Sequence, residues 1–210
     1  MPHLLHLDSS ADLATSRSRA VTASFADAWR ARGAEFTVTH RDLHRDPLPH
    51  LADSELHWPA QARKPDAAPP TEAARIQQVI LDELRAADVV VIGAPLYNYT
   101  VPSTLKVWID NVHVPGVMAG PGTQPMAGRE VVVVSSRGGL YDAGTPTEGW
   151  DHGVPVLQLI MGESLGMTVS VIQTSATLAD RLPDLFPVRE RSDAELAAAH
   201  EAARELAGRI

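Results

Sequence analysis

Hydroxyl side chains cluster in one short polar segment near the start of the chain. Residues 8–18 read DSSADLATSRS, between an apolar run and an amphipathic helical pattern. Free backbone N–H groups and the dipole at a helix N-terminus favour a bound phosphate. The side chains that could add donors are Ser9, Ser10, Thr15, Ser16, Arg17 and Ser18. The segment therefore predicts phosphate binding, with a simply capped helix after a polar loop as the alternative.

A second candidate segment, residues 94–106, reads APLYNYTVPSTLK and also begins at the end of an apolar run. Its prolines restrict the backbone, and its apolar, aromatic and amide side chains could contact the face and polar edge of a flat heteroaromatic ring. The residues that would make these contacts are Pro95, Leu96, Tyr97, Asn98 and Tyr99. A turn that only contributes to the core is the alternative, because tyrosine pairs often simply bury area.

A third segment, residues 135–149, reads SSRGGLYDAGTPTEG. Gly138 and Gly139 would let the backbone approach a ligand closely, although a tight turn could need the same residues. Arg137, which follows Ser136, could orient a carbonyl group or stabilise negative charge on a reduced ring. Together the three segments indicate a ligand site if the fold brings them to one edge.

The expected phosphate site fits a mononucleotide better than a nucleoside triphosphate or a dinucleotide. The pattern G-x-x-x-x-G-K-[ST] is absent, and no G-x-G-x-x-G follows a strand pattern. A single phosphate held by hydroxyls and backbone groups is what FMN presents. The sequence therefore favours FMN as the cofactor.

Apolar runs and helical patterns alternate along the chain. The runs are typical of buried parallel strands, and the helical patterns repeat apolar residues every three or four positions. The strand patterns cover residues 3–7, 36–40, 89–94, 130–135 and 168–173. The helical patterns cover residues 18–32, 72–86, 102–113, 150–165 and 193–209. Thr71 would cap the second helix, and Ser192 with Glu195 would form a capping box for the last.

This alternation predicts a single α/β domain over residues 1–210, with a doubly wound five-stranded parallel sheet of strand order 2-1-3-4-5. Ligands of such sheets bind beyond the carboxyl ends of the strands, where the strand order reverses. The three candidate segments follow strands 1, 3 and 4 and would meet there. Residues 41–70 form one long irregular stretch, which could fold over the same edge.

Composition and charge exclude several classes of protein and site. The chain of 210 residues has no cysteine, which excludes disulfides, thiolate metal sites, iron–sulfur clusters and cysteine nucleophiles. A net charge of −8 argues against nucleic acid as a partner. No apolar run is long enough for a membrane span, and no signal-peptide pattern is present, so the cytoplasm is the expected location.

Three other kinds of site are not favoured. Asp8-Ser9 with a distant histidine could indicate a serine hydrolase, but G-x-S-x-G is absent. A receiver domain would need an aspartate after the third strand, where Ala94-Pro95 stand. The histidines in and before the long irregular stretch have no partner carboxylate at helical spacing, so no metal site is expected. These histidines are His40, His44, His50 and His57.

The candidate segments resemble those of FMN-dependent NAD(P)H azoreductases and quinone oxidoreductases, which have a flavodoxin-like fold. The matching residues are Ser10, Ser16-Arg17-Ser18, Pro95-Leu96-Tyr97-Asn98-Tyr99, Ser103-Thr104-Leu105-Lys106 and Ser136-Arg137-Gly138-Gly139. The resemblance runs through most of the chain. It implies phosphate contacts from the first two groups and isoalloxazine contacts from residues 96–99 and 136–139. The family often has Gln in place of Arg17 and Met in place of Leu96.

The resemblance implies that two electrons pass from NADH or NADPH through FMN to a quinone, azo or related acceptor, with ping-pong kinetics. No side chain need be an obligatory acid or base, because the cofactor carries the chemistry. A one-electron flavodoxin-type carrier and a specialised biosynthetic flavoenzyme with a changed acceptor remain alternatives. Family members close the flavin pocket with a second subunit, so a homodimer is also expected.

The acceptor pocket is where the sequence departs from the family. Residues 114–128 read VPGVMAGPGTQPMAG and lack the usual aromatic residues, and their glycines and prolines predict a flexible or open loop. Trp150 and His152 could supply part of a reshaped wall, with Trp58 and Tyr141 as further candidates. A Trp150 packed inward at the start of a helix is the alternative.

Overall fold

The computed structural model, which describes residues 1–120 and 122–210, has a five-stranded sheet at its centre. The strands are β1 (His3–Asp8), β2 (Thr37–Asp42), β3 (Val89–Pro95), β4 (Glu130–Ser136) and β5 (Thr168–Thr174). Neighbouring strands all pair in parallel, in the order β2-β1-β3-β4-β5. This confirms the predicted fold class and strand order.

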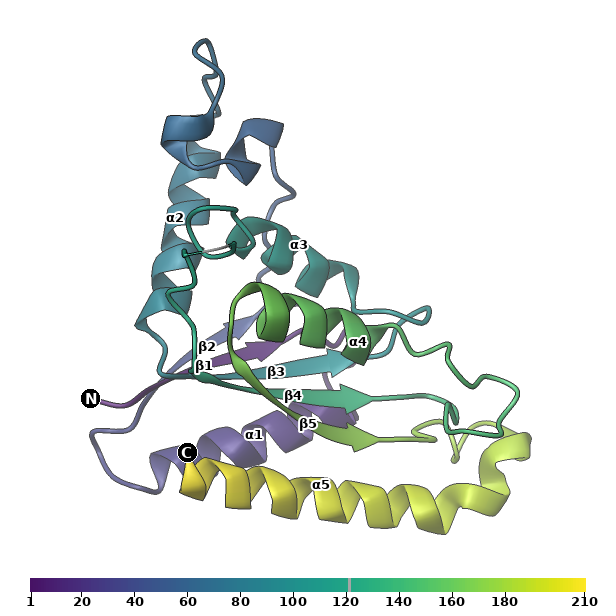
Figure 1. Cartoon of the computed structure of the whole chain (residues 1–210). Coiled ribbons are helices and arrows are strands. Elements are labelled where there is room, and N and C mark those ends of the chain that lie inside the picture. Colours follow the sequence, from purple (N-terminus) through teal and green to yellow (C-terminus); the bar gives the residue numbers. More distant parts are fainter. Residues whose placement is uncertain (121) are drawn as a thin grey trace.

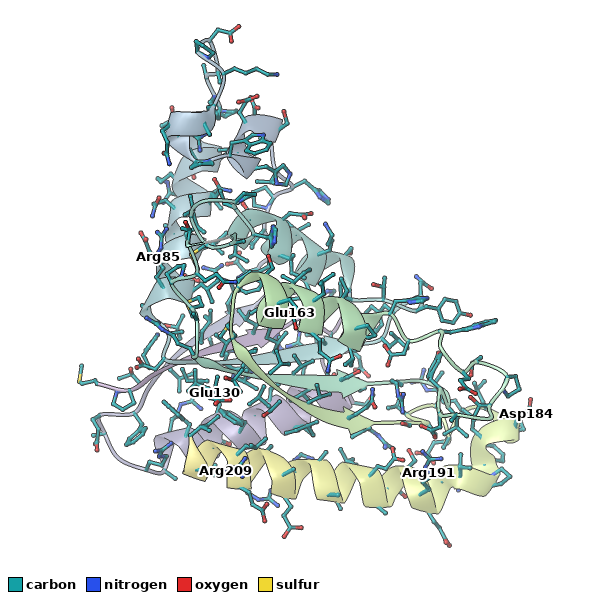
Figure 2. The ribbon with its side chains drawn as sticks, in the orientation of Figure 1. Arg85, Glu130, Glu163, Asp184, Arg191 and Arg209 are labelled. Atoms are coloured by element: carbon teal, nitrogen blue, oxygen red, sulfur yellow. The ribbon has the colours of Figure 1, made fainter. Side chains whose placement is uncertain are left out.

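Helices cover both faces of the sheet (Figure 1). One face carries α1 (Arg17–Arg30) and α5 (Arg189–Arg209), and the other carries α2 (Thr71–Ala86), α3 (Ser103–Val112) and α4 (Gly153–Leu157). Helix α5 runs antiparallel to the strands (Figure 2). Its last residue, Arg209, lies on the same side as Glu130, the first residue of β4, and Arg191 lies at the other end. The sheet therefore has a separate apolar core on each face.

The central strands are buried because both of their faces are covered. Every residue of β3 is buried, and Val90, Val91 and Ile92 have no exposed surface. Complete burial of such side chains stabilises the fold by roughly 1.5–3 kcal/mol each. The edge strands β2 and β5 are only partly covered. The continuous apolar runs therefore mark the inner strands, whose carboxyl ends lead into the candidate loops.

The two predicted helix caps are wrong. Helix α5 begins at Arg189, one turn before Ser192, and the buried hydroxyl of Ser192 donates to the carbonyl oxygen of Ser175 at 2.8 Å. The Glu195 carboxylate accepts from the backbone N–H of Ser175 at 2.7 Å. Helix α2 starts at Thr71 itself, without a side-chain cap. Ser192 and Glu195 therefore bond to a distant, buried residue and do not cap the helix.

The fourth predicted helix is shorter at its start and changes its hydrogen-bonding pattern. It begins at Gly153 rather than near Trp150, and Gln158–Ser164 continue it as π-helical turns. Helices with such turns occur often at functional sites. Because the helix starts late, Trp150 lies outside it and does not pack inward with the helical residues.

The long stretch after β2 does not fold over the carboxyl edge, so that expectation is wrong. It forms two short 3₁₀ helices, Ser54–His57 and Ala60–Ala62, and lies beside α2 (Figure 1). The Gln77 amide of α2 donates to the carbonyl oxygens of Leu56 at 2.9 Å and Asn111 at 3.2 Å, and Leu56 is fully buried. Apolar burial against α2 and α3 determines where this stretch lies.

Residues 114–128 were expected to be a flexible or open loop, and an open loop is wrong for the residues described. Met118 and Met126 are fully buried in the core beneath α2 and α3. The backbone N–H of Gly128 donates to the Gly166 carbonyl at 2.8 Å, and the Gln124 amide donates to that of Ser164 at 2.9 Å. Position 121, within this stretch, lies outside the described residues.

No described helix is long and apolar enough to cross a membrane.

Candidate functional site

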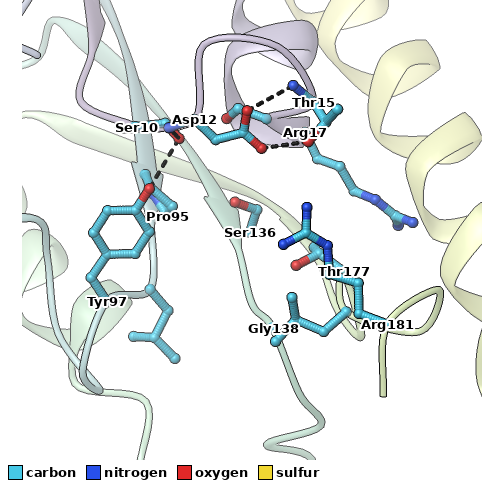
Figure 3. Close-up of a pocket in the computed structure, with 13 residues that line it drawn as sticks. Ser10, Asp12, Thr15, Arg17, Pro95, Tyr97, Ser136, Gly138, Thr177 and Arg181 are labelled. Carbon is cyan, nitrogen blue, oxygen red and sulfur yellow. Dashed lines mark hydrogen bonds between the residues drawn. The ribbon is translucent and has the colours of Figure 1, made fainter. Parts of the chain in front are cut away.

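A cavity of about 310 Å³ lies at the carboxyl ends of β1, β3 and β4 (Figure 3). The three predicted segments contribute Ser10, Asp12, Thr15, Ser16, Arg17, Pro95, Leu96, Tyr97, Ser136 and Gly138 to its lining. The stretch after β5 adds Thr177, Leu178 and Arg181. The cavity lies where the strand order reverses, and its volume is in the range of small-molecule sites.

The N-terminus of α1 forms the most polar part of the lining. Ser16 caps the helix, with its hydroxyl accepting from the N–H of Arg19 at 3.3 Å and lying 3.1 Å from the hydroxyl of fully buried Ser18. The Asp12 carboxylate already accepts from the N–H groups of Ala14 at 2.9 Å and Thr15 at 2.8 Å. An anion bound here would therefore use the helix N-terminus and the serine hydroxyls.

Ser9 has a different role from its neighbours. Its hydroxyl donates to the carbonyl oxygen of Gly93 at 2.6 Å, and the side chain is buried. This bond ties the end of β1 to β3. Ser9 therefore fixes the backbone of the loop and leaves Ser10 at the cavity.

Tyr97 links the loop after β3 to the loop after β1. Its hydroxyl lies 3.2 Å from the Ser10 hydroxyl and accepts from the N–H of Ala11 at 3.1 Å (Figure 3). The next two residues, Asn98 and Tyr99, have φ angles of +46° and +68°. Two successive positive φ values are characteristic of a tight turn, but they strain residues with a β-carbon. The fold therefore maintains a strained turn beside the cavity.

Two arginines line the cavity in different ways. The guanidinium of Arg17 donates to the Ser192 carbonyl at 2.7 Å and hydroxyl at 2.8 Å, so it points toward α5. The guanidinium of Arg181 reaches into the cavity toward Ser136 (Figure 3). No described residue forms a side-chain hydrogen bond or ion pair with it. Arg181 could not be identified from the sequence, because it stands in an irregular stretch without a motif.

Arg137 is held by protein groups instead of facing the cavity. Its side chain is buried and donates to the Ser175 hydroxyl at 2.5 Å and to Asp142 at 3.2 Å, with Asp151 3.8 Å away. Two carboxylates therefore compensate its charge. The adjacent Gly138 does line the cavity, and a β-carbon there would lie 3.0 Å from the Leu178 side chain. A side chain at this position would therefore have to displace Leu178.

Three of the four predicted acceptor-pocket residues lie around Tyr99. Its ring packs edge-to-face with Trp150 at 5.3 Å, and its carbonyl accepts from the N–H of His152 at 2.9 Å. Burial, with smaller effects of Tyr99 and Asp151, raises the pKa of Tyr141. Trp150 is 47% exposed, so the inward-packing alternative is wrong.

Trp58, the fourth predicted acceptor-pocket residue, does not lie with Tyr141, Trp150 and His152. It follows the 3₁₀ helix that packs beside α2, and it does not line the cavity. Its side chain is 49% exposed. The position of residues 41–70 therefore separates Trp58 from the other three.

Comparison with known proteins confirms the resemblance. The family described as having a flavodoxin-like fold matches residues 2–206. An FMN-dependent NADH:quinone oxidoreductase of Kineococcus radiotolerans is 72% identical over 207 residues, covering 99% of each chain. Its counterpart in Streptomyces coelicolor is 40% identical and covers 100% of this chain and 97% of its own.

Solved structures show the same fold at low sequence identity. An FMN-dependent NADH-azoreductase from Bacillus anthracis, in complex with FMN, superposes with a TM-score of 0.77 at 20% identity. The match covers 99% of this chain and 98% of that one. The chain therefore belongs to the flavodoxin-like family represented by these FMN-dependent NADH:quinone oxidoreductases.

Proposed function

We propose that this chain is an FMN-dependent oxidoreductase that passes two electrons from NADH, or from NADPH, to a quinone, azo or related acceptor. The cavity at the carboxyl edge carries the proposal, because it joins an anion-binding helix N-terminus to a loop that suits a flat ring. The relative at 72% identity bears the name of this activity and supports the assignment.

The lining residues fit a ligand with one phosphate. Ser10 and Ser16 offer hydroxyls at the cavity, and the backbone N–H of Arg17 in the first turn of α1 adds a donor although its guanidinium is engaged elsewhere. Ser18 does not line the cavity, because its side chain is fully buried, and it would act through the Ser16 hydroxyl 3.1 Å away. Arg181 supplies a positive charge at the cavity, where the sequence had pointed to the side chain of Arg17 as a donor. We therefore place the phosphate of FMN at this end of the cavity.

The loops after β3 and β4 suit the isoalloxazine ring. Pro95, Leu96 and Tyr97 line the cavity, and Asn98 and Tyr99 continue from them in the strained turn. Ser136 and Gly138 bring the backbone after β4 to the opposite side, with Gly139 next along the chain. Arg137 acts in this proposal as a positioning residue, since it ties this loop to Ser175 and Asp142.

Bound FMN would supply the hydride and electron chemistry, and the protein residues would bind, orient and shield it. Tyr99, Tyr141, Trp150 and His152 would form the wall met by both donor and acceptor. Because both substrates would use this one wall in turn, we expect ping-pong kinetics. No side chain is assigned as an obligatory acid or base.

Cofactor release and steady-state rates test the proposal. Heat-released cofactor should be FMN, and NADH oxidation in the presence of a simple quinone should give parallel double-reciprocal lines. Release of FAD, or a colourless chain that FMN cannot reconstitute, contradicts the site. An FMN-loaded chain that does not oxidise NADH with any quinone would be an electron carrier instead.

We further propose a homodimer located in the cytoplasm. Exposed aromatic side chains at Tyr99, Trp150 and Trp58 support an interface, since aromatic residues are enriched in interface cores. A second subunit is also what Trp58 would need in order to reach an acceptor pocket. A monomeric mass by light scattering at micromolar concentration would contradict the dimer, and cell fractionation tests the compartment.

A further inference from the structure

Three potential metal ligands, none of which lines the cavity, meet on the sheet face covered by α1. His6 and Asp8 lie on one face of β1, and the register of β2 places His40 directly beside His6. The two imidazole rings are 4.4 Å apart. One ligand atom from each residue lies within 4.8 Å of the other two.

The spacing of these atoms matches a tetrahedral metal site. Asp8 Oδ2 lies 3.3 Å from His6 Nε2 and 3.0 Å from His40 Nε2. Zinc binds nitrogen and oxygen at about 2.0–2.2 Å, so neighbouring tetrahedral ligands are roughly 3.3–3.6 Å apart. His40 Nε2 lies slightly closer to Asp8 Oδ2 than this spacing, and the His40 side chain, which is 43% exposed, is the one that would adjust.

His6 provides evidence for a ligand that is independent of this spacing. The residue is 5% exposed, and its Nε2 atom makes no well-aligned hydrogen bond among the described residues, its nearest polar neighbour being Asp8 Oδ2 at 3.3 Å. Buried polar atoms are nearly always satisfied. A metal ion bound to this nitrogen would remove the deficit, because a neutral imidazole offers a lone pair there.

The surrounding residues fix Asp8 as a ligand through one oxygen. Thr22 donates to Asp8 Oδ1 at 2.9 Å, which leaves Oδ2 facing the two imidazoles. A β-carbon at Gly93 would lie 2.8 Å from Asp8 Oδ1, so the glycine makes room for this carboxylate.

We propose that His6, Asp8 and His40 bind a divalent transition-metal ion, with Zn²⁺ as the fitting example. Two imidazoles and one carboxylate form a common zinc ligand set, and water would complete the tetrahedron. Water can enter because the His40 side chain is 43% exposed. The ion would join the edge strand β2 to β1 immediately before the loop that carries Ser10.

The nearby charges permit a cation at this site. The Arg19 guanidinium lies 3.7 Å from Asp8 Oδ2, but it is paired with both oxygens of Asp42 at 2.7 and 2.8 Å. Arg45 Nε also lies 3.4 Å from Asp42 Oδ2, so the two carboxylates and the two guanidinium groups balance one another before the ion binds. No metal site was expected from the sequence, because His40 was grouped there with His44, His50 and His57. The partner of His40 in this proposal is His6, which precedes it on the neighbouring strand.

Calorimetric titration with Zn²⁺ tests the proposal directly. The full chain should be prepared without a histidine tag, stripped with a chelator, dialysed and loaded with FMN. We expect saturable binding of one Zn²⁺ per chain. At a hundredfold excess over Kd, the Tm should rise by roughly 5–10 °C. A wild-type chain that binds no Zn²⁺ and gains no Tm would overturn the proposal.

Two ligand variants and one control locate the ion. His40→Ala, at a half-exposed edge position, should retain FMN but lose the Zn²⁺ binding and the Tm increase. His6→Leu should lose both while keeping the core filled. His44→Ala removes an exposed histidine from the next loop and should behave as wild type. Zn²⁺ binding that survives unchanged in His40→Ala places the ion elsewhere and refutes the assignment, even if His6→Leu does not fold.

Discussion

Replacing Arg181 by Gln should weaken the binding of FMN, because it removes a positive charge that reaches into the cavity. A hydrogen bond to a charged group contributes about 1.5–3 kcal/mol. Since about 1.4 kcal/mol corresponds to a factor of ten, Kd should rise roughly tenfold to hundredfold. The side chain is exposed, so salt should screen the interaction and reduce the difference between variant and wild type.

The assay is the quenching of FMN fluorescence on titration with cofactor-free protein at several salt concentrations. Arg189→Gln is the matched control, because it removes the same charge from an arginine paired with Asp180 at 2.8 Å that does not line the cavity. Arg181→Lys should retain part of the affinity. A Kd for Arg181→Gln within twofold of both wild type and Arg189→Gln would refute the role assigned to Arg181.

Three further predictions concern the phosphate end, the acceptor wall and an ion pair. Ser16→Ala combined with Ser18→Ala should raise the Kd for FMN by at least about tenfold in the same titration, and unchanged affinity would remove both from the site. Trp150→Ala should lower kcat/KM for the quinone more than the stopped-flow rate of flavin reduction by NADH, whereas equal losses would indicate a purely structural role. Burial raises the pKa of Asp42, but hydrogen bonds from Arg19 and backbone N–H groups hold it at about 2, below its ordinary 3.8. The stabilisation by this carboxylate is therefore present above pH 3.8 and is lost toward pH 2. Asp42→Asn should lower the Tm at neutral pH, and the difference in Tm from wild type should narrow as the pH falls from 3.8 toward 2. A Tm difference that stays constant over this pH range would contradict the role of the carboxylate.

The elements and their order could be predicted because burial on both faces leaves a clear sequence pattern. Val89 to Ile92 form an uninterrupted apolar run that is typical of a strand covered on both faces, and the structure places them in central β3. The loops that end at this edge then follow from strand order alone. This is why Ser10, Tyr97 and Gly138 could be assigned to one site from the sequence.

Features that depend on distant partners could not be predicted. Ser192 and Glu195 have capping-box spacing, yet their polar groups bond to Ser175 far along the chain. Arg181 reaches the cavity from a stretch without periodicity. His6 reads as part of an apolar strand, and only the register of β1 with β2 brings it beside His40.

The pairing of α1 with α5 has a consequence for synthesis on the ribosome. Val21, Phe25 and Trp29 belong to one of the first elements to emerge, but they pack in the same cluster as Ala203 and Ala207 near the end of the chain. Until that last helix has left the exit tunnel, the part of this stripe that packs against α5 has no cover, although the strands cover the rest. The nascent chain must therefore wait for its final segment before one whole face of the sheet can close, and in that interval the stripe is a natural target for chaperones.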